Sequence, residues 1–199
     1  QSAGLLIRRL RVRFSPGAPD LSKEEKAMKE RTGLIKFGGK DATIIGEDLR
    51  VGDLAPEFQA QTADWSVMEM LAATSGKVRI IAAVPSLDTS VCDRETRRFN
   101  VEAAALGTDV AIIVISTDLP FAQKRWCGAA GVEQVSVVSD HLNTEFGKAY
   151  GCLIKEVRLL RRAVFVVDRA GKIVYAVYMP TLGDEPDYSA VLQAAQSAL

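Results

Sequence analysis

The feature of this sequence that most constrains its fold is a pair of apolar runs, VRIIAAV at residues 78–84 and VAIIVIS at residues 110–116. Both runs are short and rich in β-branched residues, which is typical of strands buried on both faces of a sheet. Between them, residues 91–106 carry apolar side chains at helical spacing, namely Phe99, Ala103 and Leu106. Parallel strands need a crossover of this length, so the segment predicts a β-α-β unit.

The same alternation continues toward the C-terminus. Residues 117–131 predict a second helix, in which Thr117 or Asp118 caps the N-terminus and Pro120 stands in the first turn. We expect a strand at VSVVSD, a short helix at NTEFGKAYG, a β-hairpin at RAVFVVDRAGKIVYAVYM and a C-terminal helix, capped by Asp187, at DYSAVLQAAQSAL. This order predicts an α/β fold with a mixed central sheet flanked by helices on both faces.

Residues 1–32 differ in character from the rest of the chain. They combine a basic start, a Ser-Pro-Gly-Ala-Pro breaker and a charged segment that contains Met28, a candidate natural start. We expect an extension outside the core, either disordered or added to the natural chain, with a targeting arm or surface tether as the alternative. The folded domain is expected at residues 33–199, where LIKFGG and ATIIGE predict an N-terminal β-hairpin.

Charge and hydropathy exclude several classes of protein. Acidic and basic residues balance at 25 each, but four of the arginines fall in the early segment RRLRVR, so the rest of the chain is mildly acidic. A nucleic-acid footprint would need a basic stripe on the folded domain. No apolar run approaches the roughly 18 residues of a membrane helix, and the start lacks the pattern of a signal peptide. We expect no nucleic-acid partner, no membrane association and a cytoplasmic location.

The cysteines Cys92, Cys127 and Cys152 are odd in number and widely spaced, which is unlike a secreted disulfide framework. Cys92 falls in the first turn of the helix predicted after the strand at residues 78–84. Free backbone N–H groups and the helix dipole stabilise a thiolate at such a position. A reactive thiolate and an inert buried cysteine both remain compatible with this placement.

The residue three positions before Cys92 narrows the chemistry. Sites of dithiol exchange carry Cys-x-x-Cys at such a turn, whereas Thr89 stands here. The threonine hydroxyl can donate to a bound oxygen, while Pro85 fixes the chain entering the turn and can shield the sulfur. The combination favours a thiolate that attacks an oxygen substrate over one that exchanges with a protein disulfide.

The segment PSLDTSVC at residues 85–92 fits the Pro-x-x-x-Thr-x-x-Cys active-site motif of peroxiredoxins, and the chain resembles that family. It is most similar to the thiol peroxidase subfamily, the atypical two-cysteine peroxiredoxins, in PSLDTSVCDRETRRFN, STDLPFAQKRWCGAAG, EFGKAYG, RRAVFVVD and EPDYSAVL. The resemblance runs from residue 33 to the C-terminus. It implies a thioredoxin-like fold and an antioxidant enzyme that reduces hydrogen peroxide and organic hydroperoxides.

The resemblance also implies a role for each site residue. Cys92 corresponds to the peroxidatic cysteine, which becomes a sulfenic acid, and Cys127 to the resolving cysteine, which forms an intramolecular disulfide with it. Thr89, backbone amides near Cys92 and Arg162 would hold the peroxide oxygens. Arg161 is the neighbour that could be confused with Arg162, and the match to Arg-Ala-Val-x-Val-Val-Asp selects Arg162.

Partners follow from the same resemblance, which implies a thioredoxin-like reductant, a homodimer and no metal, haem or flavin. Because Cys92 and Cys127 lie on separate predicted helices, we expect the Cys92 turn and the Cys127 helix to unwind locally in each cycle. Two alternatives stay open. One is a thioredoxin-fold redox sensor or holdase switched by the same disulfide, and the other is a thiol–disulfide oxidoreductase, which Thr89 disfavours.

The remaining candidate residues have plainer interpretations. Cys152 lies outside the two-cysteine pattern and is expected to be a core or loop cysteine. A zinc site that includes His141 is disfavoured because the chain has no Cys-x-x-Cys pair, so His141 is expected in a surface loop or helix cap. Trp126 and Phe121 are expected to be packing anchors without a direct chemical role.

Overall fold

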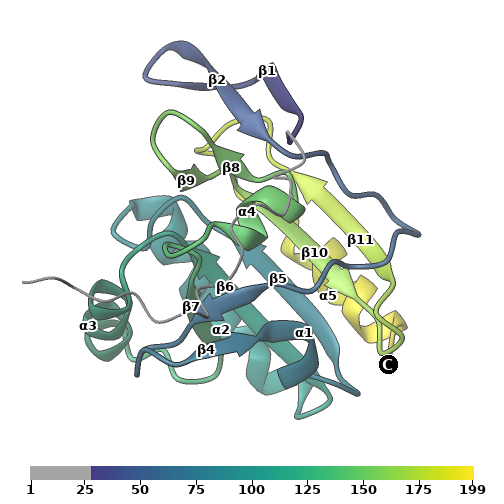
Figure 1. The fold of residues 1–199 in the computed structure, drawn as a ribbon. Helices are drawn as coiled ribbons and strands as arrows, with labels where there is room; N and C mark the ends of the chain where they lie inside the picture. Colours follow the sequence, from purple (N-terminus) through teal and green to yellow (C-terminus); the bar gives the residue numbers. More distant parts are fainter. Residues whose placement is uncertain (1–27) are drawn as a thin grey trace, which may run out of the picture.

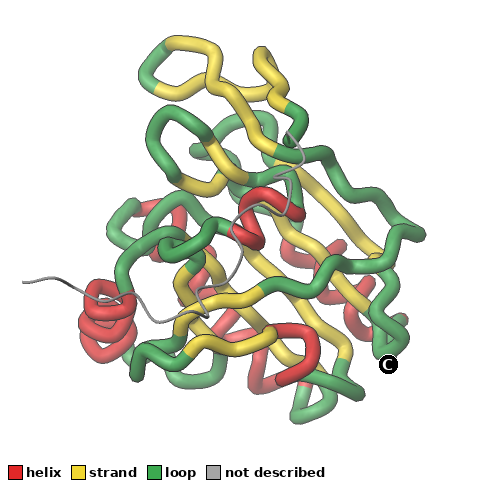
Figure 2. The backbone as a smooth tube through the Cα atoms, viewed as in Figure 1, coloured by secondary structure: helices red, strands yellow, loops and turns green. Residues whose placement is uncertain are grey.

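The computed structural model describes residues 28–199, which form two sheets and the helices around them (Figure 1). The strands are β1 (Glu30–Phe37), β2 (Lys40–Ile45), β3 (Gln59–Gln61), β4 (Val67–Glu69), β5 (Val78–Ala83), β6 (Val110–Ser116), β7 (Ser136–Ser139), β8 (Leu153–Ile154), β9 (Leu159–Leu160), β10 (Ala163–Val167) and β11 (Ile173–Tyr178). The helices are α1 (Met70–Ala73), α2 (Ser90–Leu106), α3 (Pro120–Ala130), α4 (Glu145–Ala149) and α5 (Tyr188–Ser197). Figure 2 shows the same elements coloured by type.

The main sheet has seven strands in the order β11-β10-β5-β6-β7-β3-β4. The two apolar runs of the sequence are its central strands, because β5 pairs with β6 in parallel and α2 forms the crossover between them. β7 continues the parallel arrangement on one side, whereas β10 pairs antiparallel with β5 on the other. The sheet is therefore mixed, as the sequence predicts.

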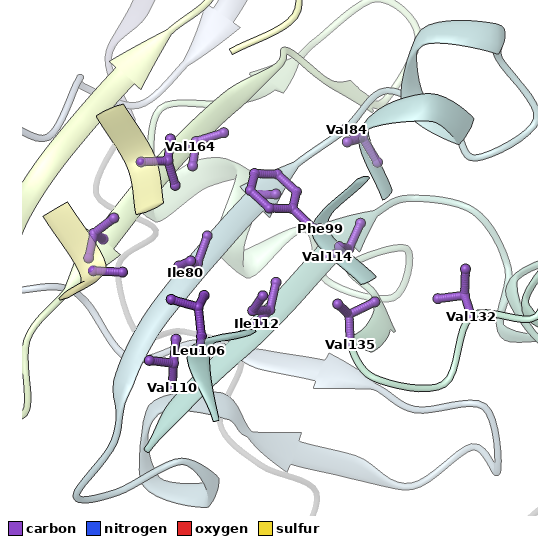
Figure 3. Packing of buried hydrophobic residues seen from close by; sticks show 14 of the residues in the cluster. Ile80, Val84, Phe99, Leu106, Val110, Ile112, Val114, Val132, Val135 and Val164 are labelled. Atoms are coloured by element: carbon purple, nitrogen blue, oxygen red, sulfur yellow. The ribbon is translucent and has the colours of Figure 1, made fainter. Parts of the chain in front are cut away.

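Successive residues of β5 face opposite sides of the sheet and enter two separate cores. Ile80 and Ala82 join a cluster covered by α2, α3 and α5, while Ile81 and Ala83 join a cluster covered by α1 and α4. Figure 3 shows the first cluster from close by, with Phe99 of α2 lying among side chains of the sheet. Helices on both faces explain why the central strands carry no polar alternation.

The N-terminal hairpin β1–β2 forms a second, four-stranded sheet with β8 and β9 and stands apart from the main sheet in Figure 1. Its chain leaves through Gly46, whose φ is +90° and where an added Cβ would lie 2.0 Å from the carbonyl oxygen of Lys148. Only glycine fits there, and its missing side chain lets the chain after the hairpin pass close to α4. β1 begins at Glu30, three residues before the expected domain start at residue 33, and the rest of the expected extension, residues 1–27, lies outside the described residues.

One helix cap predicted from the sequence is present and another is not. The carboxylate of Asp187 accepts the backbone N–H of Ala190 at 3.1 Å and caps α5. The cap expected for α3 from Thr117 or Asp118 is wrong, because the helix begins at Pro120 with Leu119 as the N-cap residue and without a side-chain bond. The Asp118 carboxylate is instead held by the loop that precedes α2.

Asp140 gives the fold a pH-dependent contact between β7 and α4. Its carboxylate accepts the backbone N–H groups of Phe146 at 3.1 Å and Gly147 at 2.8 Å. Burial raises the pKa of Asp140 to about 7, and the two backbone hydrogen bonds only partly oppose this effect. The folded protein therefore holds a proton here at pH values at which the unfolded chain, with an ordinary aspartate pKa of about 4, has released it.

This proton predicts how stability changes with pH. The stabilising contribution of Asp140 is complete below about pH 4 and is lost as the pH rises toward 7. We expect the free energy of unfolding of the wild type, minus that of Asp140→Asn, to fall as the pH rises across this range, because the variant has no titrating group at this position. Urea unfolding of both proteins at matched pH values measures the difference, and a difference that stays constant or rises would contradict the raised pKa.

No helix within residues 28–199 is both long and apolar enough to cross a membrane.

Candidate active site

Cys92 lies at the start of α2, directly after the loop that leaves the central strand β5. Thr89 is the N-cap residue of the helix, and the first backbone bond inside it runs from the N–H of Asp93 to the carbonyl of Thr89 at 2.9 Å. The N–H groups of Ser90, Val91 and Cys92 precede that bond, so they have no partner inside the helix and lie at the end of α2 that carries Cys92. Cys92 itself is fully buried.

Two side chains contact the sulfur of Cys92. The Thr89 hydroxyl lies 2.8 Å from Sγ, and Nη2 of Arg162 donates to Sγ at 3.2 Å. The same hydroxyl lies 3.0 Å from the carbonyl oxygen of Ser86 and has only one proton to donate. It can donate to a Cys92 thiolate, or turn to Ser86 and accept from the thiol, so it serves both protonation states of the sulfur.

Arg162 is held in place by a buried acid that the sequence analysis missed. It forms an ion pair with Glu95, and both side chains are almost completely buried. Arg162 also donates to the carbonyl oxygen of Leu182 at 3.1 Å. Glu95 follows Cys92 by three residues, so both side chains lie on one face of α2. That spacing is a signal that sequence reasoning could have used.

Burial and charge act against each other in this pair. Burial raises the pKa of the Glu95 carboxyl to about 7, although Arg162 opposes the shift. Burial also disfavours the charge on Arg162, but Glu95 and the Cys92 sulfur outweigh it and raise the pKa of the guanidinium. Arg162 therefore stays charged beside the sulfur.

Arg161 and Arg162 point to different surroundings, as expected for adjacent residues of an extended chain. Arg161 forms an ion pair with Asp48, donates to the carbonyl oxygen of Gly151 at 2.8 Å and lies 3.9 Å from the ring centre of Tyr178. The structure thus brings Arg162 to Cys92 and directs Arg161 to the base of the N-terminal hairpin.

The loop between β5 and α2 begins at Pro85, which is buried directly behind the strand. Asp118, from the loop between β6 and α3, accepts the hydroxyl of Ser86 at 2.7 Å and the backbone N–H of Leu87 at 2.8 Å. The loop therefore reaches Thr89 with its path fixed by a second β-α unit. Sequence reasoning missed this contact because it depends on the neighbouring positions of β5 and β6.

Cys127 lies on α3, half-buried against the same core cluster that contains Cys92. Burial raises the pKa of the Cys127 thiol. The two helices are joined next to both cysteines, because Nε1 of Trp126 donates to the carboxylate of Asp93 at 3.2 Å. Both cysteines are free thiols in this structure.

Cys152 is separated from this site by the sheet. It belongs to the cluster on the opposite face, is fully buried, and its thiol donates to the carbonyl oxygen of Tyr150 at 3.4 Å. Burial raises the pKa of this thiol well above its ordinary value. Cys152 is therefore a core cysteine, in agreement with the interpretation of the sequence.

The aromatic residues of α3 divide into a buried and an exposed one. Trp126 is buried, as expected of a packing anchor. The same expectation for Phe121 is wrong, because its side chain is 66% exposed and contacts the half-exposed ring of Trp65, with the ring centres 4.4 Å apart. Positions five apart on a helix differ by about 140° in direction, so these two residues cannot face the same core. His141 lies in the turn after β7, with Nδ1 3.1 Å from the Ser139 hydroxyl.

A shallow depression lies on the surface at the start of α2. It is lined by the loop before the helix, by its first turns and by α3, with Leu87, Asp88, Thr89, Ser90, Asp93, Arg94 and Trp126 as lining residues. Thr89 belongs both to this lining and to the contacts of the Cys92 sulfur. Thr89 therefore connects the depression with the buried sulfur.

These features together define a class of protein. A helix-start cysteine follows a central strand of a mixed sheet, a threonine occupies the place of a second cysteine, and a buried guanidinium donates to the sulfur. Cationic and hydroxyl donors around a sulfur define a reactive thiol, because they stabilise the thiolate. The arrangement agrees with the peroxiredoxin resemblance of the sequence.

Comparison with known proteins narrows the class. The Redoxin family model matches residues 50–192. The chain is 50% identical to the thiol peroxidase of Bacillus subtilis (strain 168) over 163 residues, which cover 82% of this chain and 96% of that protein. It is 48% identical to the thiol peroxidase of Halalkalibacterium halodurans over 165 residues, covering 83% of this chain and 98% of the relative. The chain belongs to the Redoxin family, within its thiol peroxidases, and is a peroxiredoxin-type peroxidase.

Solved structures agree with this assignment. A peroxiredoxin-like protein from Aquifex aeolicus superposes with a TM-score of 0.75 at 37% identity, covering 85% of this chain and 98% of the other. A thiol peroxidase from Chromobacterium violaceum gives a TM-score of 0.72 at 22% identity, with 82% and 95% covered, and shows the shared fold. The predicted thioredoxin-like fold is confirmed.

Proposed function

We propose that this peroxidase reduces hydroperoxides through the thiolate of Cys92. The sulfur attacks one oxygen of the substrate ROOH, so that an S–O bond forms as the O–O bond breaks. The leaving alkoxide or hydroxide takes a proton from solvent and departs as alcohol or water. Cys92 is oxidised by two electrons to a sulfenic acid.

The observation that carries this proposal is the convergence of donors on the sulfur. The Thr89 hydroxyl and the Arg162 guanidinium contact Sγ, and Cys92 stands in the first turn of α2, where the backbone amides have no partner inside the helix. These donors stabilise the thiolate before the reaction and the charge on the leaving oxygen during it. Nε of Arg162 has no acceptor among residues 28–199, so the guanidinium keeps a further donor for a substrate oxygen. Pro85 supports the site by fixing the loop that precedes Thr89.

We further propose that Cys127 resolves the sulfenic acid. Its thiolate attacks the sulfur of Cys92, an S–S bond forms and hydroxide leaves as water, giving an intramolecular disulfide. Both cysteines start on helices that contact each other through Asp93 and Trp126. A disulfide needs α-carbons within about 7 Å and suitable side-chain directions, so we propose local unwinding of the Cys92 turn and the Cys127 helix.

Completion of the cycle needs two electrons from outside the chain. A dithiol protein of the thioredoxin type can supply them by exchange with the Cys92–Cys127 disulfide. Hydrogen peroxide and organic hydroperoxides are the proposed substrates. We place the cycle in the cytoplasm, because a reducing compartment keeps such a dithiol available for turnover.

Replacement of Cys127 by serine tests whether Cys92 reacts with peroxide and Cys127 only resolves the sulfenic acid. We expect the variant to reduce one equivalent of peroxide per chain at the wild-type rate and then to stop, because no disulfide forms for thioredoxin to reduce. A rapid-mixing measurement gives the first turnover, and a thioredoxin-coupled assay gives the steady state. Unimpaired steady-state turnover of Cys127→Ser would remove Cys127 from the mechanism.

An exposed apolar patch beside the site supports a homodimer. Trp65 contacts both Phe121 and the ring of His141, and Leu119 and Leu142 are exposed next to these two residues. Contiguous exposed apolar side chains of this kind mark interaction surfaces. We propose that a second copy of the chain covers the patch.

A charge placed in this patch should separate the subunits. Phe121→Glu is expected to shift the sedimentation coefficient to that of a monomer with little change in the free energy of unfolding, because the Phe121 side chain is mostly exposed. Val101→Glu is the matched control, since Val101 is equally exposed on α2 but outside the patch. A dimer that persists in Phe121→Glu would show that this patch is not the interface.

A further inference from the structure

Asp118 binds the loop that leads to Cys92 without touching the sulfur itself. One carboxylate oxygen accepts the hydroxyl of Ser86 at 2.7 Å, and the other accepts the backbone N–H of Leu87 at 2.8 Å. The second oxygen also accepts the hydroxyl of Ser116 at 2.8 Å. A single carboxylate thus ties the main chain of this loop to the end of β6.

Two further bonds connect this carboxylate to the reacting sulfur. The carbonyl oxygen of Ser86 accepts the backbone N–H of Thr89 at 3.1 Å and lies 3.0 Å from the Thr89 hydroxyl. That hydroxyl lies 2.8 Å from Sγ of Cys92. Displacement of Ser86 would therefore move the threonine donor away from the sulfur.

Asp118 is itself firmly anchored. Its backbone carbonyl accepts the hydroxyl of Ser139, and the amide of Gln123 donates to the Ser116 hydroxyl at 3.0 Å and to the carbonyl of Val138 at 2.8 Å. Gln123 belongs to α3, the helix that carries Cys127. The carboxylate is therefore a fixed point against which the more exposed loop can be held.

We propose that Asp118 is a positioning residue for the peroxidase reaction, which rests on the proposed role of Cys92. It holds Ser86 and Leu87 so that Thr89 is aligned for peroxide attack. Unwinding of the Cys92 turn displaces Thr89, whose backbone N–H is bonded to Ser86, so the bonds of Asp118 to this loop also oppose disulfide formation. Loss of Asp118 therefore slows the first step and accelerates the second, whereas general damage to the fold would not produce opposite effects.

Single-turnover kinetics of the reduced, full-length protein with hydrogen peroxide test this proposal. Quenched samples give the rate constant of Cys92 oxidation and, separately, that of disulfide formation from the sulfenic acid. For Asp118→Ala we expect attack to be about tenfold slower and disulfide formation to be faster than in the wild type. Asp118→Asn keeps one acceptor oxygen and should recover part of the attack rate.

Asp168→Ala is the matched control, because Asp168 accepts the backbone N–H of Lys172 at 2.8 Å in a turn remote from Cys92. Both of its rate constants should equal those of the wild type. An attack rate of Asp118→Ala within about twofold of the wild type, or a parallel fall of both steps, would overturn the proposal. If Asp118→Ala does not fold, Ser86→Ala is the second variant. It removes the hydroxyl that donates to Asp118 and that also accepts the backbone N–H of Asp88 at 3.3 Å. It should slow attack about threefold, and an unchanged rate would overturn the proposal. A wild-type Cys92 that does not react with peroxide would refute the proposed function instead.

Discussion

Replacement of Cys92 by serine is expected to lower peroxide consumption by at least about a thousandfold, which is the effect typical of removing a nucleophile. Serine keeps the shape of the buried side chain, so the fold should be retained. Its hydroxyl does not ionise near neutral pH and cannot attack the O–O bond as a thiolate does. A thioredoxin-coupled assay and a single-turnover measurement with hydrogen peroxide would both show the loss.

Cys152→Ser is the control for this experiment. Cys152 is as completely buried as Cys92 but lies in the core on the opposite face of the sheet. Its replacement should leave peroxide turnover near the wild-type level. Substantial activity in Cys92→Ser, or loss of activity in Cys152→Ser, would show that Cys92 is not the cysteine that reacts with peroxide.

Replacement of Arg162 by methionine is expected to impair both the reaction and the fold. The sulfur and the leaving oxygen lose a charged donor, and removal of one such donor slows related reactions about 10²–10³-fold. Glu95 is left buried without its cation, which typically costs about 3–5 kcal/mol of stability. Stopped-flow kinetics and urea unfolding measure the two effects separately.

The double variant Glu95→Gln/Arg162→Met separates these effects. Removing both charges should recover much of the free energy of unfolding, because no uncompensated buried charge remains. The rate of peroxide attack should stay low, since the guanidinium is still missing. Recovery of the rate together with stability would mean that Arg162 supports only the fold.

Much of this fold can be predicted from the sequence because its signals are local. The buried strands β5 and β6 are visible as apolar runs, and the crossover helix between them as a helical pattern. The N-cap of α3 cannot be predicted in this way, because Asp118 is equally suited to capping a helix and to bonding a neighbouring loop. Its actual partner is set by the contact between two β-α units, which sequence spacing does not reveal.

The candidate site likewise has features that local sequence predicts and features that depend on packing. The proximity of Cys92 and Thr89 can be predicted from the sequence, because the two residues stand three positions apart at the start of one helix. Arg162 lies 70 residues away from Cys92 in the chain, so only the family resemblance predicts its place in the site. Its ion pair with Glu95 and the exposure of Phe121 depend on how the helices pack, so they become visible only in the structure.

The most direct test of the proposed mechanism is a peptide map of the reduced wild-type protein after one equivalent of hydrogen peroxide. We expect a single new cross-linked species, in which the peptide containing Cys92 is joined to the peptide containing Cys127. Trapping with a sulfenic-acid reagent in Cys127→Ser should label Cys92 alone. A disulfide between Cys92 and Cys152, or a sulfenic acid on another cysteine, would contradict it.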